Sequence, residues 1–329
     1  VNASQAVFDL AARRDLESKT AALNAVSLDE ANARDLVTFV VTNLYLQAIA
    51  GESRIQTART QVTTAEALLT QATNLRNAGA APGIDVVRAQ VQVQAQKQRL
   101  MVAENDLAKQ MLQLARAIGV PTGQRLQLAD KTMETVATGV SLDEALKRAA
   151  DSRSDYKASL ARVRAAEATL ESTRSGRIPT VHVAGDIGTI GSNPSNAKRT
   201  YAMSVGVRVP LFDQDRTGRQ VENTAAVRQR QAESADLLQR IEADVRTAYL
   251  DVQSTEQQLA VARERVALAN QELSLARIRF TAGVTSNLEV IQAQNEVAAA
   301  ADNEVAGTFA FNLAKAALAR AIGNSRPTP

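Results

Sequence analysis

The sequence predicts a mainly α-helical fold made of two tandem, long coiled-coil hairpins with a short β-hairpin between them. Three observations lead to this fold class: an internal repeat, an alanine-rich composition and a heptad pattern of apolar residues. Hydrophobic residues make up 45% of the 329 residues, aromatic residues make up only 3%, and there is no Trp. This composition is typical of long, closely packed helices rather than of a compact enzyme.

The internal repeat has an offset of 204 residues and contains no gaps. Its clearest mark is the segment LARAIG, which occurs at residues 114–119 and again at residues 318–323. Residues 41–119 share 23 identities in 79 positions with residues 245–323. The chain is therefore a tandem duplication, and both copies are expected to fold in the same way.

Apolar residues in the second copy recur in alternating steps of four and three from Ile241 to Phe280. One row of this seam is large and the other is mostly Ala: Val245, Val252, Leu259, Val266, Leu273 and Phe280 in the first, and Ala248, Ala262, Ala269 and Ala276 in the second. The first copy repeats these rows as Val41, Ile55, Val62 and Leu69, and as Leu44, Ala58, Ala65 and Ala72. A seven-residue period predicts a left-handed coiled coil. We expect a seam of this length not to be buried within a monomer, so it predicts symmetric copies of the chain.

Glycine and proline set the expected helix lengths. No Pro interrupts residues 9–81 or residues 211–326, and the first strong interruption of each copy is GAAPG at residues 79–83 or GVTSN at residues 283–287. Each half is predicted to be one helix of about 65 residues, a tight turn and a returning helix of about 35 residues. At a rise of 1.5 Å per residue, the long helix measures roughly 95 to 100 Å.

Between residues 177 and 213 the apolar period changes from seven residues to two. Two strands of about ten residues are predicted here. The apolar face carries Val181, Val183, Ile187, Tyr201, Met203, Val205, Val207 and Val209. The opposite face carries His182, Ala184, Asp186, Gly188, Ala202, Ser204, Gly206 and Arg208. This length and alternation fit membrane-spanning β-strands, although a half-buried hairpin of a soluble protein has the same pattern.

Charge and residue usage exclude several function classes. The net charge is only +3 and the basic residues are dispersed, so nucleic acid is not an expected partner. The sequence has no Cys and a single His, His182, and it contains no phosphate-binding loop and no metal-ligand spacing. We therefore expect no enzymatic activity, no catalytic residues, no cofactor and no metal. No apolar run is long enough to predict a membrane-spanning helix.

Several longer motifs follow one another in a distinctive order. They are SQAVFDL at residues 4–10, AAPGIDVVRAQ at 80–90, SLDEALKRAADSRSDY at 141–156, RIPTV at 177–181, VPLFDQDR at 209–216, FTAGVTSNLEVIQAQ at 280–294 and the two LARAIG segments. In these motifs and in their order, the sequence resembles the TolC-type outer-membrane efflux ducts, the outer membrane efflux protein family. The resemblance covers nearly the whole chain.

The resemblance implies a homotrimer in the outer membrane of a Gram-negative bacterium that extends into the periplasm. The strands of the three copies would form one β-barrel in outer-membrane lipid, and their helices would form one trimeric α-helical tube. The implied function is the channel of a tripartite efflux or type I secretion system. Such a duct conducts cargo from a periplasmic adaptor (membrane fusion) protein and an inner-membrane transporter to the exterior.

The repeat and the resemblance together divide the chain into five segments. These are a first repeat with strand tail, long helix, tip and return helix over residues 1–119, a connector and equatorial helix over 120–176, the strand pair over 177–212, the second helical hairpin over 213–323 and a tail over 324–329. The equatorial helix is expected over about residues 141–175. Applied backwards, the repeat offset predicts a counterpart of residues 141–205 upstream of Val1. We therefore expect the chain to be N-terminally incomplete and to supply half of the strands of its share of the barrel.

The two hairpin turns are the predicted contact site for the adaptor. They are expected to be the ends farthest from the strands, and their glycines leave the backbone open to a partner. The predicted contact residues are Ala78, Gly79, Ala80, Gly283, Val284 and Thr285. The alternative is that Gly79 and Gly283 only end the helices, because Gly readily adopts positive φ.

Four residues just beyond the turns are the predicted pore constriction: Asp85, Arg88, Glu289 and Gln292. Each pair is spaced i, i+3 and projects from one helix face. In the resembled family, acidic residues at the positions of Glu289 and Gln292 line the narrowest part of the closed tube, so the match is partial. Three copies of Glu289, with or without Asp85, would form an anionic ring that favours cations, while Arg88 would alternatively pair with one of these carboxylates. A simpler alternative is that all four are solvated positions at a helix start, where the dipole favours acidic residues.

Two other protein classes fit part of the pattern. A periplasmic adaptor also has a long heptad hairpin with a tight tip, but it sets one hairpin in a strand-rich frame, whereas this chain has two hairpins in tandem. A coiled-coil scaffold protein would not explain the alternating strands at residues 181–209. The outer-membrane duct is therefore the preferred interpretation.

Overall fold

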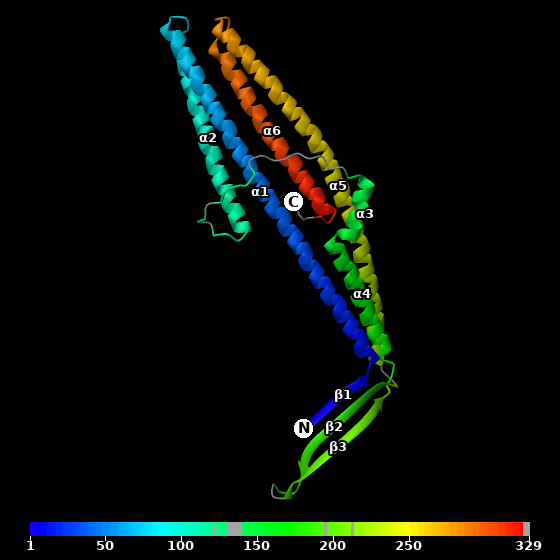
Figure 1. The fold of residues 1–329 in the computed structure, drawn as a ribbon. Helices are drawn as coiled ribbons and strands as arrows, with labels where there is room; N and C mark the ends of the chain where they lie inside the picture. The colour runs from blue at the N-terminus through cyan, green and yellow to red at the C-terminus, as the bar shows by residue number, and fades with distance from the viewer. Residues whose placement is uncertain (122, 125, 131–139, 194–195, 212–213, 325–329) are drawn as a thin grey trace. The chain divides into compact units, whose positions relative to one another are not determined.

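The computed structural model is mainly α-helical, as predicted (Figure 1). It describes residues 1–121, 123–124, 126–130, 140–193, 196–211 and 214–324. In chain order its elements are β1 (Asn2–Phe8), α1 (Leu10–Asn77), α2 (Gly83–Ala117), α3 (Leu142–Ser152), α4 (Ser154–Ser175), β2 (Thr180–Ile190), β3 (Lys198–Arg208), α5 (Gln214–Thr281) and α6 (Asn287–Ala321).

The helix bounds confirm the duplication. Helices α1 and α5 each have 68 residues, and helices α2 and α6 each have 35. Every bound of the second pair lies 204 residues after its counterpart in the first pair. The predicted succession of a long helix, a tight turn and a returning helix is thus confirmed in both copies.

The chain divides into two compact units, each containing segments that are distant in sequence. One unit comprises residues 1–34 and 150–242, and the other comprises residues 35–149 and 243–329. The first unit, called the sheet unit below, holds the three strands, α4 and the N-terminal parts of α1 and α5. The second, called the hairpin unit, holds both hairpin turns together with α2 and α6.

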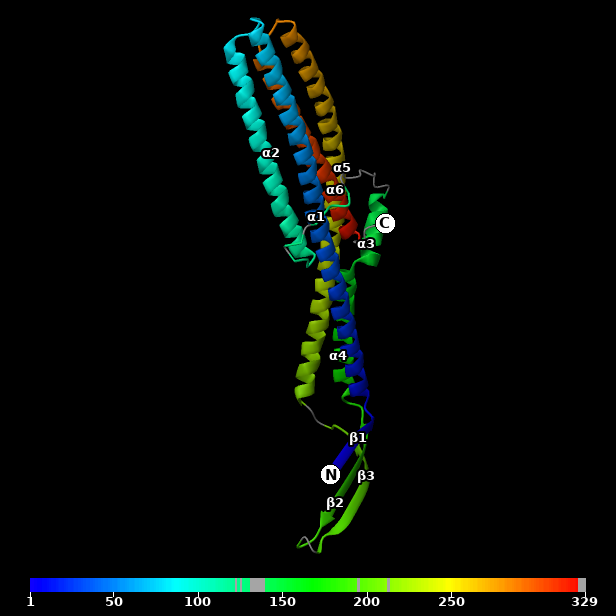
Figure 2. The same cartoon turned by 60° about the vertical axis from the view of Figure 1, so that its left-hand side comes forward.

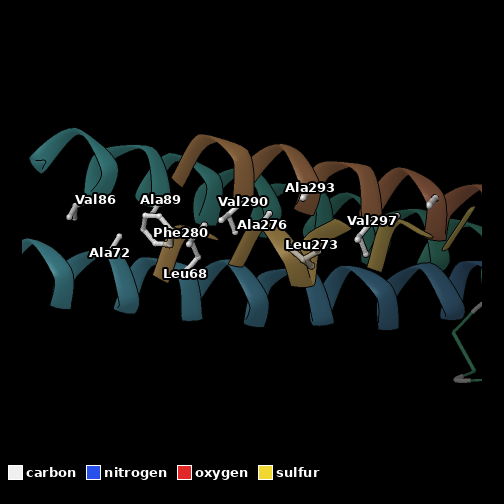
Figure 3. Packing of buried hydrophobic residues seen from close by; sticks show 12 residues of the cluster. Leu68, Ala72, Val86, Ala89, Leu273, Ala276, Phe280, Val290, Ala293 and Val297 are labelled. Carbon is white, nitrogen blue, oxygen red and sulfur yellow. The ribbon is translucent and has the colours of Figure 1, made fainter. Parts of the chain in front are cut away.

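One apolar cluster in the hairpin unit joins all four of its long helices (Figure 3). Its members are Leu68 and Ala72 of α1, Val86 and Ala89 of α2, Ala269, Leu273, Ala276 and Phe280 of α5, and Val290, Ala293, Val297 and Ala300 of α6. Half of the twelve are Ala, which allows helix backbones to approach closely. Phe280 is the single aromatic residue of the cluster and is 4% exposed.

The predicted seam of α5 is buried mostly within the single chain. Between Val245 and Phe280 only Thr255, Ala262 and Val266 are half-buried, and the other seam positions are buried. The expectation that a monomer cannot bury this seam is therefore wrong, because α6 and the first hairpin cover it. In the first copy the large row is buried at Ile55 but is shifted by one position nearer the turn, where Leu68 is buried and Leu69 is only half-buried.

Glycines with positive φ end the four long helices. They are Gly79 (φ 72°), Gly119 (φ 75°), Gly283 (φ 72°) and Gly323 (φ 76°), and none of the described residues other than Gly has a positive φ. Gly adopts this region without the strain that a Cβ would cause. After α1, the N–H of Ala80 donates to the carbonyl of Leu75 at 2.8 Å, and the N–H of Gly79 donates to that of Arg76 at 2.9 Å. This pair of bonds is a Schellman motif, and it recurs at the other three ends. The two LARAIG segments are thus matching helix stops.

We expect Gly79→Ala to lower the free energy of unfolding by about 1–2 kcal/mol, because a Cβ is strained at positive φ. The matched control is Gly83→Ala, at the first residue of α2, where a Cβ would meet no atom within 4 Å. There the substitution is expected to be neutral or to stabilise by up to about 1 kcal/mol. Denaturant unfolding followed by circular dichroism measures both, and equal losses at the two positions would contradict the role given to Gly79.

The sheet unit contains an antiparallel sheet in the order β1-β2-β3. The register places Val183 opposite Val205 and Ile187 opposite Tyr201, so the predicted apolar faces of the two long strands coincide. The N-terminal tail forms a third strand, β1, which pairs with β2 and has an irregularity between Ala6 and Phe8. Figure 2 shows the three strands side by side.

Hydroxyl groups connect the helices of the sheet unit. The side-chain oxygens of Ser18 and Thr169 lie 2.8 Å apart, and Ser172 Oγ donates to a backbone carbonyl of α1 at 2.8 Å. The hydroxyls of Ser159 and Ser234 lie 3.0 Å apart in a buried position. These small polar residues let α4 pack closely against α1 and α5 while their polar atoms stay paired.

The predicted equatorial helix over residues 141–175 is wrong in one respect, because it is broken into α3 and α4 at Arg153. Arg153 has an extended backbone (φ −60°, ψ 123°), and its guanidinium donates two hydrogen bonds to Asp155 at 3.0 and 2.6 Å. Burial by itself raises the pKa of Asp155, but the hydrogen bonds and charge of Arg153 outweigh it and the pKa is lowered. The ion pair thus fixes the start of α4, where the helix dipole also favours a carboxylate.

Candidate functional site at the hairpin turns

The two hairpin turns present small side chains and backbone to solvent. Of the predicted contact residues, Ala78, Gly79, Ala80, Gly283 and Val284 are exposed and Thr285 is half-buried. A Cβ added at Gly79 or Gly283 would meet no atom within 4 Å. Both turns are therefore open in the single chain, and their backbone is held by the Schellman hydrogen bonds rather than by neighbouring side chains.

A buried polar contact joins the starts of α2 and α6. Asp85 is 2% exposed and Asn287 is 0% exposed. Asn287 Nδ2 donates to the backbone oxygen of Asp85 at 2.6 Å. Arg88 Nη1 lies 3.6 Å from Asp85 Oδ1, so these two residues of α2 form an ion pair. Because the Asp85 side chain is enclosed between the hairpins, it is not accessible to a pore in this conformation.

Glu289 occupies the equivalent position in the second copy but remains half-buried. Its Oε1 lies 3.1 Å from Arg279 Nε, and Thr285 Oγ1 donates to its Oε2 at 2.6 Å. These contacts connect the last turn of α5 to the first turn of α6. Arg88 and Gln292 are exposed, so three of the four predicted constriction residues are accessible in the single chain. Their role in a pore stays a prediction.

A second layer of polar contacts between the hairpins was not predicted. Gln92 Nε2 donates to Asn295 Oδ1 at 3.0 Å, and Gln294 Nε2 donates to the carbonyl of Thr64 at 3.4 Å. Gln92 follows Asp85 by seven residues, as Gln294 follows Asn287. The heptad spacing of these polar residues was therefore the feature of the sequence from which amide contacts with the neighbouring helix could have been predicted.

The single histidine of the sequence, His182, packs against the neighbouring strand of the sheet. His182 lies on β2 opposite Gly206, where an added Cβ would come within 2.5 Å of the imidazole ring. The ring thus packs over a glycine of the neighbouring strand. In the part of the chain that the structure describes, no group of three or more His, Cys, Asp or Glu residues is arranged to hold a metal. None of the described helices has an apolar stretch suited to crossing a bilayer.

Comparisons with known proteins point to one family. The family model described as outer membrane efflux protein matches residues 145–324. The pyoverdine export outer membrane protein OpmQ of Pseudomonas putida is 24% identical over 320 residues, covering 93% of this chain and 66% of the relative. OpmQ of Pseudomonas aeruginosa is 26% identical over 314 residues, covering 92% of this chain and 64% of the relative. The chain thus spans slightly less than two thirds of these relatives' length.

Solved structures share the fold. The outer-membrane channel OprN has a TM-score of 0.81 at 19% identity, covering 98% of this chain and 74% of OprN. CusC has a TM-score of 0.79 at 17% identity, covering 98% of this chain and 76% of CusC. The outer membrane protein VceC of Vibrio cholerae has a TM-score of 0.78 at 18% identity, covering 98% of this chain and 78% of VceC. At these identities the likeness establishes the architecture.

Proposed function

The chain belongs to the outer membrane efflux protein family, whose model matches more than half of it, and we propose that it forms the outer-membrane duct of a tripartite efflux or type I secretion system. The predicted family and the predicted location in the outer membrane are confirmed. The family is one of transport proteins rather than enzymes. Membership favours the duct over the periplasmic adaptor and the coiled-coil scaffold.

The single observation that carries the proposal is the in-register apolar face of the sheet. Tyr201, Met203 and Val205 are 87%, 79% and 68% exposed, and their cross-strand neighbours include Ile187 and Val183. A face of large apolar side chains left in water is unfavourable. Outer-membrane lipid covers such a face in a barrel, where small and polar residues alternate with it toward the lumen.

The proposed assembly is a homotrimer. The seam of α5 is occupied within the chain, but a second row remains exposed: Val261, Leu268 and Leu275 lie seven residues apart and are 67%, 57% and 62% exposed. On α2, Val87 and Val91 are also exposed. Exposed rows with a heptad period are suited to packing against helices of other copies. The trimer is thus supported by this second row rather than by the predicted seam.

The proposed partners are a periplasmic adaptor at the hairpin turns and an inner-membrane transporter that delivers the cargo. The open, small-residue surface of residues 78–80 and 283–285 supports contact of its backbone with another protein. The buried Asp85–Asn287 contact lies directly behind both turns and joins them. A partner that binds both turns therefore meets a single connected surface.

Glu289 is the residue proposed to control ion passage. We expect Glu289→Gln in the complete trimeric protein, purified in mild detergent, to reduce its preference for cations in planar-bilayer recordings, because a ring of carboxylates stabilises cations. Glu304→Gln is the control, since Glu304 lies on the same helix farther from the turn and pairs with Arg263 at 3.8 Å. Unchanged selectivity in the Glu289 variant would place the gate elsewhere, and absence of channels in the unsubstituted protein would refute the proposed duct.

A further inference from the structure

A groove in the hairpin unit is lined by α1, α2 and α6, at a distance from the turns. It holds about 550 Å³, which lies within the range of small-molecule sites. Its α1 lining, residues 54–61, lies about 25–35 Å along the helix from the first turn. The groove is therefore distinct from the residues proposed to meet an adaptor or to control ion passage.

Three hydrogen-bond donors without partners line this groove. Arg54 and Arg99 are exposed, and neither makes an ion pair or hydrogen bond with another described residue. Gln96 is 2% exposed, and its Nε2 has no hydrogen-bond partner. A buried amide without a partner is unfavourable. Two guanidinium groups and an amide N–H together match the acceptor oxygens of a carboxylate.

The second hairpin serves as an internal reference for this groove. The residues 204 positions after Arg54, Gln96 and Arg99 are Gln258, Ala300 and Asn303. Ala300 is 0% exposed and belongs to the apolar cluster. In the second hairpin a methyl group therefore packs at the position that Gln96 occupies in the first. The fold thus does not require the charges or the buried amide, which are particular to the first hairpin.

Half of the remaining lining is apolar, and the other half is polar: Thr57, Gln61, Gln98, Asp106 and Asp302. Ala58, Ala95, Val102 and Ala298 line the groove beside the donors. Two carboxylates also line it, Asp302 and Asp106, of which Asp106 pairs with Lys109 at 3.5 Å, so a second negative charge on a ligand would be repelled. We propose that this groove binds a small amphiphilic organic monocarboxylate, with its carboxylate at Arg54, Gln96 and Arg99 and its apolar body against the Ala and Val side chains. This site does not depend on the proposed duct function.

The test uses ligand-observed fluorine NMR on the complete chain in mild detergent, with 4-fluorobenzoate as the probe and the neutral 4-fluorobenzyl alcohol as its control. Binding of the carboxylate at millimolar concentration and not of the alcohol is expected. The double variant Arg54→Gln and Arg99→Asn copies the second hairpin and should weaken binding about tenfold or more, because charged hydrogen bonds are lost. Gln96→Ala should weaken binding several-fold.

Two further variants separate the site from general charge effects. Arg246→Gln removes a cation from α5 outside the groove lining and should leave the affinity unchanged. Asp302→Asn should strengthen binding, because it removes the repulsion of the carboxylate. Circular dichroism confirms that each variant is folded. Equal affinity of the parent and the double variant, equal binding of the alcohol, or no binding of 4-fluorobenzoate to the parent would overturn the proposal.

Discussion

Phe280→Ala is expected to lower the free energy of unfolding of the hairpin unit by about 3–5 kcal/mol. Phe280 is the only aromatic residue in a cluster of twelve, and six of its eleven companions are Ala. Alanine side chains are too short to move into the vacated space, so the cavity would persist rather than collapse. Urea unfolding followed by far-ultraviolet circular dichroism measures the loss.

The matched control for this prediction is Phe280→Leu. Leucine keeps most of the buried apolar volume, so the expected loss is about 1.5 kcal/mol or less. A substitution to Ala that costs no more than the one to Leu would show that the cluster repacks easily. In that case the packing of Phe280 in the cluster (Figure 3) would not be what stabilises the unit.

The helix bounds could be predicted because they depend on local chemistry. A glycine that adopts positive φ ends a helix through its own backbone, whatever lies around it, and the repeat supplies each signal twice. The break at Arg153 carries no such signal, since neither Gly nor Pro stands there. It depends on an ion pair with Asp155, which becomes visible only once the backbone is folded.

The candidate site could be predicted only in part. The i, i+3 spacing of Asp85 and Arg88 indicates that they share a helix face, and Arg88 Nη1 lies 3.6 Å from Asp85 Oδ1. Spacing does not indicate which helix covers that face, so the burial of Asp85 against Asn287 could not be foreseen. The one-position error at Leu69 has a related cause, because an apolar row with a period of 3.5 drifts around a helix of 3.6 residues per turn.

Substitution of Val284 by Trp is expected to abolish cargo export by the complete protein while leaving it folded and inserted in the outer membrane. Val284 is 69% exposed at the second turn, and its N–H donates to the carbonyl of Arg279 at 3.0 Å. The backbone of the turn is thus fixed by hydrogen bonds that a larger side chain does not remove. Ala80→Trp is expected to act in the same way at the first turn, where the N–H of Ala80 donates to Leu75.

Export is measured in a strain that lacks its own duct, and the amount of protein is measured in isolated outer membranes. Val284→Ala and Ala80→Ser change the same positions without adding bulk, so both controls should keep export near the unsubstituted level. If only the Trp variants lose export, the added bulk obstructs a partner at the turns. The small substitutions serve as controls because they leave the same Schellman hydrogen bonds in place. If the Trp variants export normally, the turn glycines serve only to end α1 and α5, and the adaptor must bind along the helices instead.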